Sequence, residues 1–254
     1  MEQYKNIYGL VGLHLVHSFS ENFFNQKFES EEINAKYVNF EIPHIDDFKR
    51  IIENNSNLNG LNITIPYKEQ IIPFLDEIDS TAKEIGAINV IKFITNHNGV
   101  TKLKGYNTDV IGFYKSIKPL LKPIHTHALI LGTGGAAKAI AHGLKTIGVK
   151  FKFVSRTPNN EVLSYKELTP IVMDKYKVII NTTPLGMYPN INSCPNIPYE
   201  FISTNHICYD LTYNPDITLF LKKSKEQGAT IKNGLEMLIL QAEAAWEIWQ
   251  QKIQ

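Results

Sequence analysis

Polar side chains that could carry chemistry gather in four short clusters in the first half of the chain. Hydroxyls and amides suit recognition of a small polar ligand, and a lysine together with a carboxylate can bind and move a proton. Each cluster also has a structural explanation: Ser20 and Asp109 can cap helices, Lys68 can be a surface lysine and Asn89 a turn residue. The clusters are His17-Ser18-Phe19-Ser20, Asn62-Ile63-Thr64-Ile65-Pro66-Tyr67-Lys68, Gly86-Ala87-Ile88-Asn89 and Gly105-Tyr106-Asn107-Thr108-Asp109.

A glycine-rich turn stands in the second half, where Gly132-Thr133-Gly134-Gly135-Ala136-Ala137 follows the apolar residues 127–131. The pattern G-x-G-x-x-A is a permitted variant of the dinucleotide-binding fingerprint. The first glycine permits a tight turn, the second lets the backbone approach a pyrophosphate, and Ala137 keeps helix and sheet close. Backbone N–H groups at the start of the helix favour the anion. The turn therefore predicts a nicotinamide dinucleotide and hydride transfer.

The residues after the next strand indicate which dinucleotide is bound. An Asp or Glu at this place would bind the ribose 2′-hydroxyl and repel a 2′-phosphate. The chain instead has Ser155, Arg156 and Thr157 there. A guanidinium with two hydroxyls suits a phosphate through charge-assisted hydrogen bonds. The sequence therefore predicts NADP.

The elements that must position these residues alternate between strands and helices. Such alternation predicts an α/β fold with parallel sheets covered by helices. In the first half we expect strands at 7–12, 37–40, 61–65 and 89–93, helices at 20–28, 46–53 and 78–85, and a hairpin turn at 96–99 leading to 101–103. In the second half we expect strands at 127–131, 151–154, 178–181 and 207–209, a helix at 136–147 and a long amphipathic helix at 234–249. The boundary between two domains falls near 105–125, where a helix is followed by Pro119 and Pro123.

Composition excludes several classes of protein. The 254 residues are 43% hydrophobic and 20% charged, which is ordinary for a globular protein and argues against disorder. Lys plus Arg number 26 and Asp plus Glu 25, so the net charge is +1. The chain therefore lacks the excess of positive charge that is typical of proteins that bind nucleic acid or an anionic membrane. The two cysteines form no metal motif, and the polar N-terminus lacks the apolar run of a signal peptide. We expect a cytoplasmic enzyme without a metal.

The order of the four clusters, the glycine turn and two later segments resembles the shikimate dehydrogenase family. The later segments are Tyr209-Asp210-Leu211-Thr212-Tyr213-Asn214-Pro215 and Asn233-Gly234-Leu235-Glu236-Met237-Leu238-Ile239-Leu240-Gln241-Ala242. The resemblance covers nearly the whole chain. It implies NADPH-dependent, reversible reduction of 3-dehydroshikimate to shikimate, in the pathway to chorismate and the aromatic amino acids.

The resemblance also implies a role for each matching residue. Lys68 and Asp109 would be the catalytic pair, since carbonyl reduction needs a proton donor as negative charge develops on oxygen. Ser18, Ser20 and Tyr213 would bind the substrate carboxylate, and Thr64, Asn89 and Gln241 the ring hydroxyls, with Asn62 beside them. The cofactor would contact Gly132, Thr133, Gly134, Gly135, Ala136, Ser155, Arg156, Thr157, Leu211 and Glu236.

The same resemblance implies two α/β domains. Residues 1–108 would form the substrate-binding catalytic domain, joined by the C-terminal helix 235–254, and residues 109–234 an NADP-binding Rossmann-like domain. The enzyme would be a monomer or a homodimer.

Several residues depart from the family pattern. Glu21 stands in place of a proline, Val110 in place of a glycine and Val90 in place of a threonine. Ser155 replaces an asparagine, and Asn160 lies where a second basic residue often grips the 2′-phosphate. Glu236 replaces a glycine, and a last helix of the family is expected to be missing after Trp249. These changes bear on cofactor preference rather than on the catalytic pair.

Three alternatives remain open at this point. A quinate/shikimate dehydrogenase with relaxed choice between NAD and NADP would have the same serines and catalytic pair. Another two-domain enzyme, such as a methylenetetrahydrofolate or amino-acid dehydrogenase, would lack the serine cluster and the Asn107-Thr108-Asp109 cluster. A non-catalytic binding protein for a small acid would not need Lys68 and Asp109.

Overall fold

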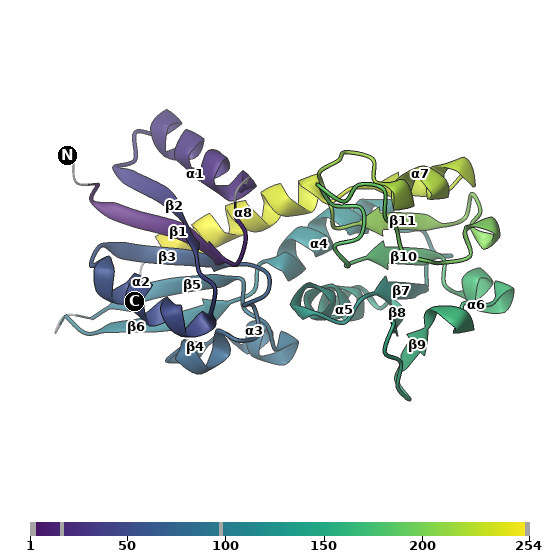
Figure 1. Ribbon diagram of the computed structural model, residues 1–254, viewed down its shortest axis with the longest axis horizontal. Coiled ribbons are helices and arrows are strands. Elements are labelled where there is room, and N and C mark those ends of the chain that lie inside the picture. Colours follow the sequence, from purple (N-terminus) through teal and green to yellow (C-terminus); the bar gives the residue numbers. More distant parts are fainter. Residues whose placement is uncertain (1–3, 16–17, 97–98, 252–254) are drawn as a thin grey trace. The chain divides into compact units, whose positions relative to one another are not determined.

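The chain folds into two compact units, each built on its own six-stranded sheet (Figure 1). The computed structural model describes residues 4–15, 18–96 and 99–251. The first unit comprises Met1–Thr108 and Ala242–Gln254, and the second Asp109–Gln241. His17 of the first cluster, and His97 and Asn98 of the expected hairpin turn, lie outside the described residues.

The first sheet has the strand order β2-β1-β3-β5-β6-β4. Strand β1 pairs in parallel with β2 and β3, whereas β5 runs antiparallel to both β3 and β6, and β4 is parallel to β6. The expected hairpin is present as β5 and β6, and only part of this sheet is parallel. The strands are β1 (Asn6–Gly12), β2 (Ala35–Glu41), β3 (Leu58–Ile63), β4 (Glu77–Ile78), β5 (Val90–Thr95) and β6 (Thr101–Tyr106).

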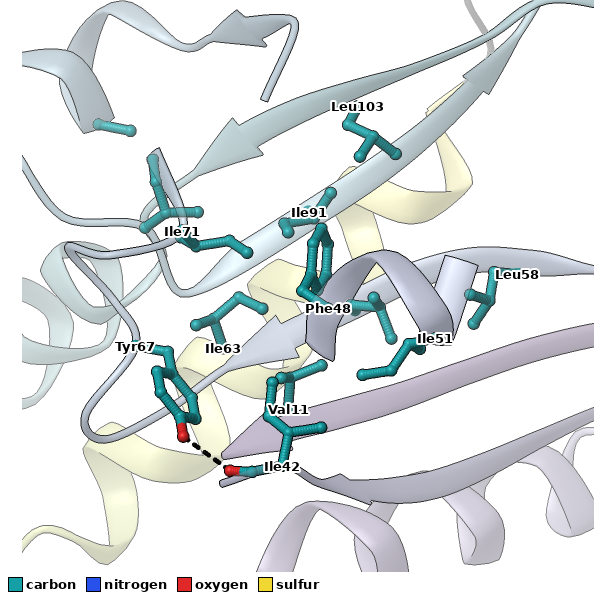
Figure 2. Packing of buried hydrophobic residues seen from close by; sticks show 13 residues of the cluster. Val11, Ile42, Phe48, Ile51, Leu58, Ile63, Tyr67, Ile71, Ile91 and Leu103 are labelled. Atoms are coloured by element: carbon teal, nitrogen blue, oxygen red, sulfur yellow. Dashed lines mark hydrogen bonds between the residues drawn. The ribbon is translucent and has the colours of Figure 1, made fainter. Parts of the chain in front are cut away.

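Helices cover both faces of the first sheet, because successive strand residues point to opposite sides. Tyr8 and Leu10 of β1 pack with α1 and the end of α8, while Val11 packs with α2 and α3. Figure 2 shows this second core, with Phe48 and Ile51 of α2 placed over the strands. The helices are α1 (Phe19–Ser30), α2 (Phe48–Asn54), α3 (Ser80–Ile85) and α8 (Leu235–Gln250), of which α8 belongs to the first unit from Ala242 onward.

The end of α8 is fixed to the first sheet by close contacts. The indole Nε1 of Trp249 donates to the carbonyl of Ile91 at 3.0 Å. Gly60 permits this approach, because a Cβ at Gly60 would lie 2.3 Å from the Trp249 Nε1. The ammonium of Lys92 donates to the carbonyl of Ile248 at 2.8 Å and so binds the C-terminal end of the helix.

The second sheet is entirely parallel, with the order β12-β11-β10-β7-β8-β9. Numbered along this unit, that is the Rossmann order 3-2-1-4-5-6, in which a dinucleotide binds where the order reverses. The α/β fold with a Rossmann-type unit is therefore confirmed. Its strands are β7 (His127–Leu131), β8 (Lys150–Ser155), β9 (Val162–Ser164), β10 (Val178–Asn181), β11 (Ile207–Asp210) and β12 (Thr230–Lys232).

Helices cover both faces of the second sheet, with a hydrophobic core on each face. Ala128 and Ile130 pack with α4, α5 and Met237 of α8, whereas Leu129 and Leu131 pack with α6 and α7. The helices are α4 (Asp109–Ile117), α5 (Gly135–Ile147), α6 (Pro170–Lys175) and α7 (Leu219–Glu226). Short 3₁₀ turns lie at Ile45–Asp47, Ile72–Phe74, Lys118–Leu120, Tyr165–Glu167 and Tyr199–Phe201.

Some local expectations from the sequence were wrong. The helix expected at 78–85 begins at Ser80, because Ile78 pairs with β6 and the Asp79 carboxylate caps the backbone N–H groups of Thr81 and Ala82. The strand expected at 61–65 ends at Ile63. The apolar and polar residues of this strand alternate, but the polar ones do not all face solvent, because Asn62 is only 5% exposed.

No helix within the described ranges combines the length and the apolar character needed to cross a bilayer. Among the same residues, no three or more His, Cys, Asp or Glu side chains come together as a potential metal site.

Candidate active site

Buried hydrogen bonds in the first unit connect two of the predicted substrate-binding residues, Asn62 and Asn89, and a third, Ser20, is buried beside them. Tyr37 of β2, fully buried, donates from its phenol to Oδ1 of Asn62 at 2.7 Å. The Ser20 hydroxyl of α1 lies close to the same phenol. Nδ2 of Asn62 donates to the carbonyl of Asn89 at 3.2 Å. Burial raises the pKa of Tyr37 well above its usual range, so the phenol remains a neutral donor.

The side chain of Asn89 carries the same network into the last of the four clusters. Its Oδ1 accepts from the Thr108 backbone N–H at 2.7 Å, and its Nδ2 donates to the Thr108 hydroxyl at 3.0 Å. Nδ2 of Asn107 donates to the carbonyl of Ala87 at 2.8 Å. Both pairs tie the segment before Asp109 to the segment before β5. The fold therefore joins the clusters that contain Asn62, Asn89 and Asp109 through buried hydrogen bonds.

The serine cluster lies at the start of α1, where Ser18 rather than Ser20 is the N-cap. The Ser18 hydroxyl accepts from the Glu21 backbone N–H at 3.3 Å, and Ser20 is buried in the first turn. Ser20, which the sequence also allowed as a cap, instead lies inside the first turn of α1, with its hydroxyl close to the Tyr37 phenol. The Glu21 carboxylate accepts from Nδ2 of Asn39 at 2.5 Å.

Lys68 lies in the irregular segment after β3, which is held by the core. The phenol of Tyr67 donates to the carbonyl of Ile42 at 2.7 Å, a bond drawn in Figure 2, and Ile71 is fully buried. The carbonyl of Lys68 accepts from the Ile88 N–H at 2.7 Å. Thr64, half-buried, donates its N–H to the carbonyl of Val11 at 2.9 Å. The backbone that carries the lysine is thus fixed on both sides.

Asp109 and Gln241 belong to the second unit, where Asp109 begins α4 and Gln241 lies in α8. Both side chains are mostly buried, at 6% and 8% exposed. Nε2 of Gln241 donates to the carbonyl of Leu238 at 2.9 Å. The two helices approach closely through Gly112, where a Cβ would lie 2.4 Å from the Met237 carbonyl oxygen.

The glycine turn has the geometry that a pyrophosphate requires. Gly132 has a φ of +111°, which favours glycine, and a Cβ on Gly134 would meet nothing within 4 Å. No side chain caps α5, and no acidic residue stands in its first turn. Its N–H groups and dipole are therefore directed at open space suited to an anion. The residues present fit the pyrophosphate of a dinucleotide.

The predicted 2′-phosphate residues begin at the carboxyl end of β8, the strand next to β7. The Gly132 N–H donates to the carbonyl of Val154 at 2.9 Å, which joins the turn to this strand end. Ser155 is half-buried, and Arg156 and Thr157 are exposed. The Thr157 N–H donates to the Ser155 hydroxyl at 3.2 Å. One cation and two hydroxyls thus lie beside the turn.

Leu211 and Tyr213 follow β11 and are both half-buried. The Leu211 N–H donates to the carbonyl of Asn181 at 3.0 Å, so this loop leaves the sheet beside the end of β10. Glu236, exposed in the first turn of α8, forms an ion pair with Lys232 of β12. The residue that departs from the family glycine is thus an ion-paired carboxylate.

Three buried polar residues at these sites were missed from the sequence: Tyr37, Asn181 and Asp210. A tyrosine in an apolar strand usually indicates core packing, and nothing in the sequence separated Tyr37 from that background. Asp210 and Asn181 each end a strand, which is where polar residues of a parallel sheet gather, and this signal was available.

Two shallow surface hollows of about 380 and 470 Å³ lie around α2 in the first unit. Neither is lined by a predicted site residue.

Residues 10–91 match the shikimate dehydrogenase substrate binding domain. Over 263 residues the chain is 39% identical to the shikimate dehydrogenase (NADP(+)) of Methanosphaera stadtmanae, covering 96% of this chain and 90% of that one. The crystal structure of shikimate dehydrogenase from Aquifex aeolicus superposes with a TM-score of 0.86 at 37% identity, covering 98% of this chain and 94% of that one. The enzyme of Thermus thermophilus, in complex with NADP(H) and shikimate, gives a TM-score of 0.83 at 27% identity over 96% of this chain and 93% of that one. The family predicted from the sequence is confirmed: the chain belongs to the shikimate dehydrogenase family.

Proposed function

We propose that this chain catalyses the reversible, NADP-dependent reduction of 3-dehydroshikimate to shikimate, with Lys68 and Asp109 as its catalytic pair. The family is that of NADP-dependent oxidoreductases of the shikimate pathway, which agrees with the predicted enzyme class and cofactor. The observation that carries the proposal is the buried hydrogen-bond network of Tyr37, Asn62 and Asn89, with Ser20 beside it, in the unit that matches the substrate-binding domain.

The substrate contacts follow from the kind of group that each residue offers. Hydroxyls of Ser18, Ser20 and Tyr213 can donate to a carboxylate, and a hydrogen bond to a charged group is worth about 1.5–3 kcal/mol. Amides and hydroxyls of Thr64, Asn89 and Gln241 can both donate to and accept from ring hydroxyls. Asn62 supports them by fixing the Asn89 segment.

The catalytic pair transfers the proton at the oxygen that belongs to a ketone in 3-dehydroshikimate and to an alcohol in shikimate. During reduction that oxygen gains negative charge, which an ammonium stabilises before it donates the proton. In the reverse direction the neutral amine of Lys68 accepts the proton from the alcohol. In this assignment the negative charge of Asp109 favours the ammonium form of Lys68, and its carboxylate accepts a hydrogen bond from a substrate hydroxyl.

The second unit holds the cofactor, whose nicotinamide supplies or accepts the hydride when bound. Backbone N–H groups of Gly132–Ala136 bind the pyrophosphate, and Ser155, Arg156 and Thr157 bind the 2′-phosphate. Leu211 and the start of α8 near Glu236 border the nicotinamide. In this assignment residues 1–108 with the C-terminal helix form the substrate domain and residues 109–234 the NADP domain.

The test is an absorbance assay of nicotinamide reduction with purified protein. We expect turnover with shikimate and NADP, lower efficiency with NAD, and little turnover with quinate. Efficient oxidation of quinate with NAD would instead establish the quinate/shikimate alternative. No turnover of either acid, with intact binding of shikimate, would make the chain a binding protein.

Solved relatives are bound to shikimate, and we propose the same small-molecule partner for this chain. We propose that it acts without nucleic acid or membrane, as a monomer or a homodimer. Its cytoplasmic location stays a prediction.

A further inference from the structure

A single carboxylate at the carboxyl end of β11 joins three segments of the second unit. Asp210, fully buried, accepts from Nδ2 of Asn181 at 3.0 Å, from the Thr212 N–H at 3.0 Å and from the Thr218 hydroxyl at 2.6 Å. These donors lie at the end of β10, in the loop after β11 and at the N-cap of α7. An ionised carboxylate is an acceptor only, which matches three donors.

Asn181 extends the arrangement into the loop after β10. Its Oδ1 accepts from the Thr183 N–H at 3.1 Å and from the Thr183 hydroxyl at 2.6 Å. Its Nδ2 also lies 3.3 Å from the Leu185 carbonyl, and its own carbonyl accepts from the Leu211 N–H at 3.0 Å. The loops after β10 and β11 therefore leave the sheet as one hydrogen-bonded unit.

The loop after β10 also contacts the glycine turn and the strand before it. The N–H and the hydroxyl of Thr182 both donate to the carbonyl of Leu131, the residue before the turn, at 3.0 and 2.7 Å. A Cβ on Gly132 would lie 2.7 Å from the Thr182 hydroxyl oxygen. Strands β7 and β10 are neighbours at the point where the strand order reverses, which is where dinucleotides bind in this fold.

We propose that Asp210 is a positioning residue for the nicotinamide half of the cofactor site. The inference rests on the proposed function, in which Leu211 and the adjoining loop border the nicotinamide. Asp210 acts through Asn181 and Thr212 and sets the path of both loops beside the ring. Replacing it with asparagine keeps the shape but removes the negative charge, which weakens the bonds from Asn181 and Thr212 by turning a charged acceptor into a neutral one.

The protonation state of Asp210 supports this role. Burial raises its pKa to about 6, against the lowering effect of the hydrogen bonds from Thr218, Thr212 and Asn181. At neutral pH the group is therefore still the acceptor-only carboxylate. The nearby Tyr199 phenol, whose pKa burial raises far above its usual value, stays neutral and adds no charge.

The test compares NADP with adenosine 2′,5′-bisphosphate, a cofactor fragment that lacks nicotinamide, in the full-length chain. For Asp210→Asn we expect the Kd for NADP to rise on the order of 10-fold, with the Kd for the fragment unchanged. With shikimate, kcat should fall by about 10- to 100-fold while the KM for shikimate is retained, because a small displacement of a reacting group is costly. Asp174→Asn, an exposed carboxylate of α6 paired with Lys177, is the matched control.

A second pair of variants guards against failure of the first to fold. Thr218→Val removes the shortest donor to Asp210, and Thr218→Ser keeps it. We expect the loss of NADP affinity relative to the fragment in the valine variant and its rescue in the serine variant. Equal weakening of NADP and the fragment, or unchanged kcat and NADP affinity in Asp210→Asn, would overturn the proposal. Because the binding comparison needs no shikimate, it can succeed even if wild-type protein fails to turn shikimate over, an outcome that would refute only the proposed function.

Discussion

Three candidate substrate groups of the first unit, Ser20, Asn62 and Asn89, are buried side chains, whereas the candidate phosphate groups of the second unit are backbone amides and an exposed guanidinium. Ser20, Asn62 and Asn89 are between 3% and 8% exposed, while Thr133, Gly134 and Arg156 are exposed. A buried polar group that loses its partner costs about 1–3 kcal/mol, so the first arrangement fixes its side chains before any ligand arrives.

This difference matches the two kinds of ligand. A small ring with several hydroxyls is distinguished by directed side-chain bonds, each of which must be positioned in advance. A pyrophosphate is a concentrated anion that a row of N–H groups and a helix dipole can bind without side chains. Substitutions should therefore separate effects on substrate binding from effects on cofactor binding.

The largest effect is expected from Lys68→Ala. A positioned acid contributes roughly 10²–10⁴-fold, so turnover should fall by that factor. The Kd for NADP, measured by direct titration, should barely change, because Lys68 belongs to the first unit. Lys102→Ala, an exposed lysine of the same unit, is the control. Near-normal turnover in Lys68→Ala would remove the lysine from the mechanism.

Ser18 has both a predicted substrate role and an observed capping role, which two substitutions can separate. Aspartate caps a helix as well as serine does, but its charge repels a substrate carboxylate. Ser18→Asp should therefore keep the thermal midpoint and raise the KM for shikimate by about 10- to 100-fold or more. Ser18→Ala should lose both stability and substrate affinity. If Ser18→Asp binds shikimate normally, the hydroxyl serves the helix alone.

Tyr37→Phe removes the phenol between Ser20 and Asn62. Oδ1 of Asn62 would then be buried without its donor, so we expect about 1–3 kcal/mol lower stability and a roughly 10-fold higher Kd for shikimate. NADP affinity should not change. Tyr8→Phe is the control, because Tyr8 is also buried in this unit and its phenol accepts a long bond of 3.4 Å from Nε2 of Gln250. Equal stability losses with unchanged shikimate binding in both variants would make Tyr37 a core residue only.

Arg156→Ala should give the smallest effect, because the guanidinium is exposed and water screens its charge. We expect the KM for NADP to rise about 3- to 10-fold and that for NAD to stay nearly constant, since NAD has no 2′-phosphate. Asn160→Arg should tighten NADP selectively. The measurement is the ratio of catalytic efficiencies with NADP and NAD. A wild type that prefers NAD, or an Arg156→Ala variant that harms both cofactors alike, would contradict the 2′-phosphate assignment.

The sequence by itself determined the family, the α/β class and most of the elements, because these depend on local signals. The glycine turn is fixed by the φ that only glycine adopts easily, and the strand before it is a run of five buried or half-buried residues. The elements it missed (β4, β9, β12, α6 and α7) have two to eight residues, too few for a periodic pattern to emerge.

Only the tertiary structure decided which polar residues meet. Tyr37 lies 25 residues from Asn62, and Asn181 lies 29 residues from Asp210, yet each pair is hydrogen-bonded inside a core. The structure likewise decided that Ser18 rather than Ser20 caps α1, because the helix begins at Phe19 and Ser20 lies buried in its first turn. The physical reason is the same in each case: a buried donor or acceptor must find a partner, and strand pairing rather than sequence distance determines which partner is in reach.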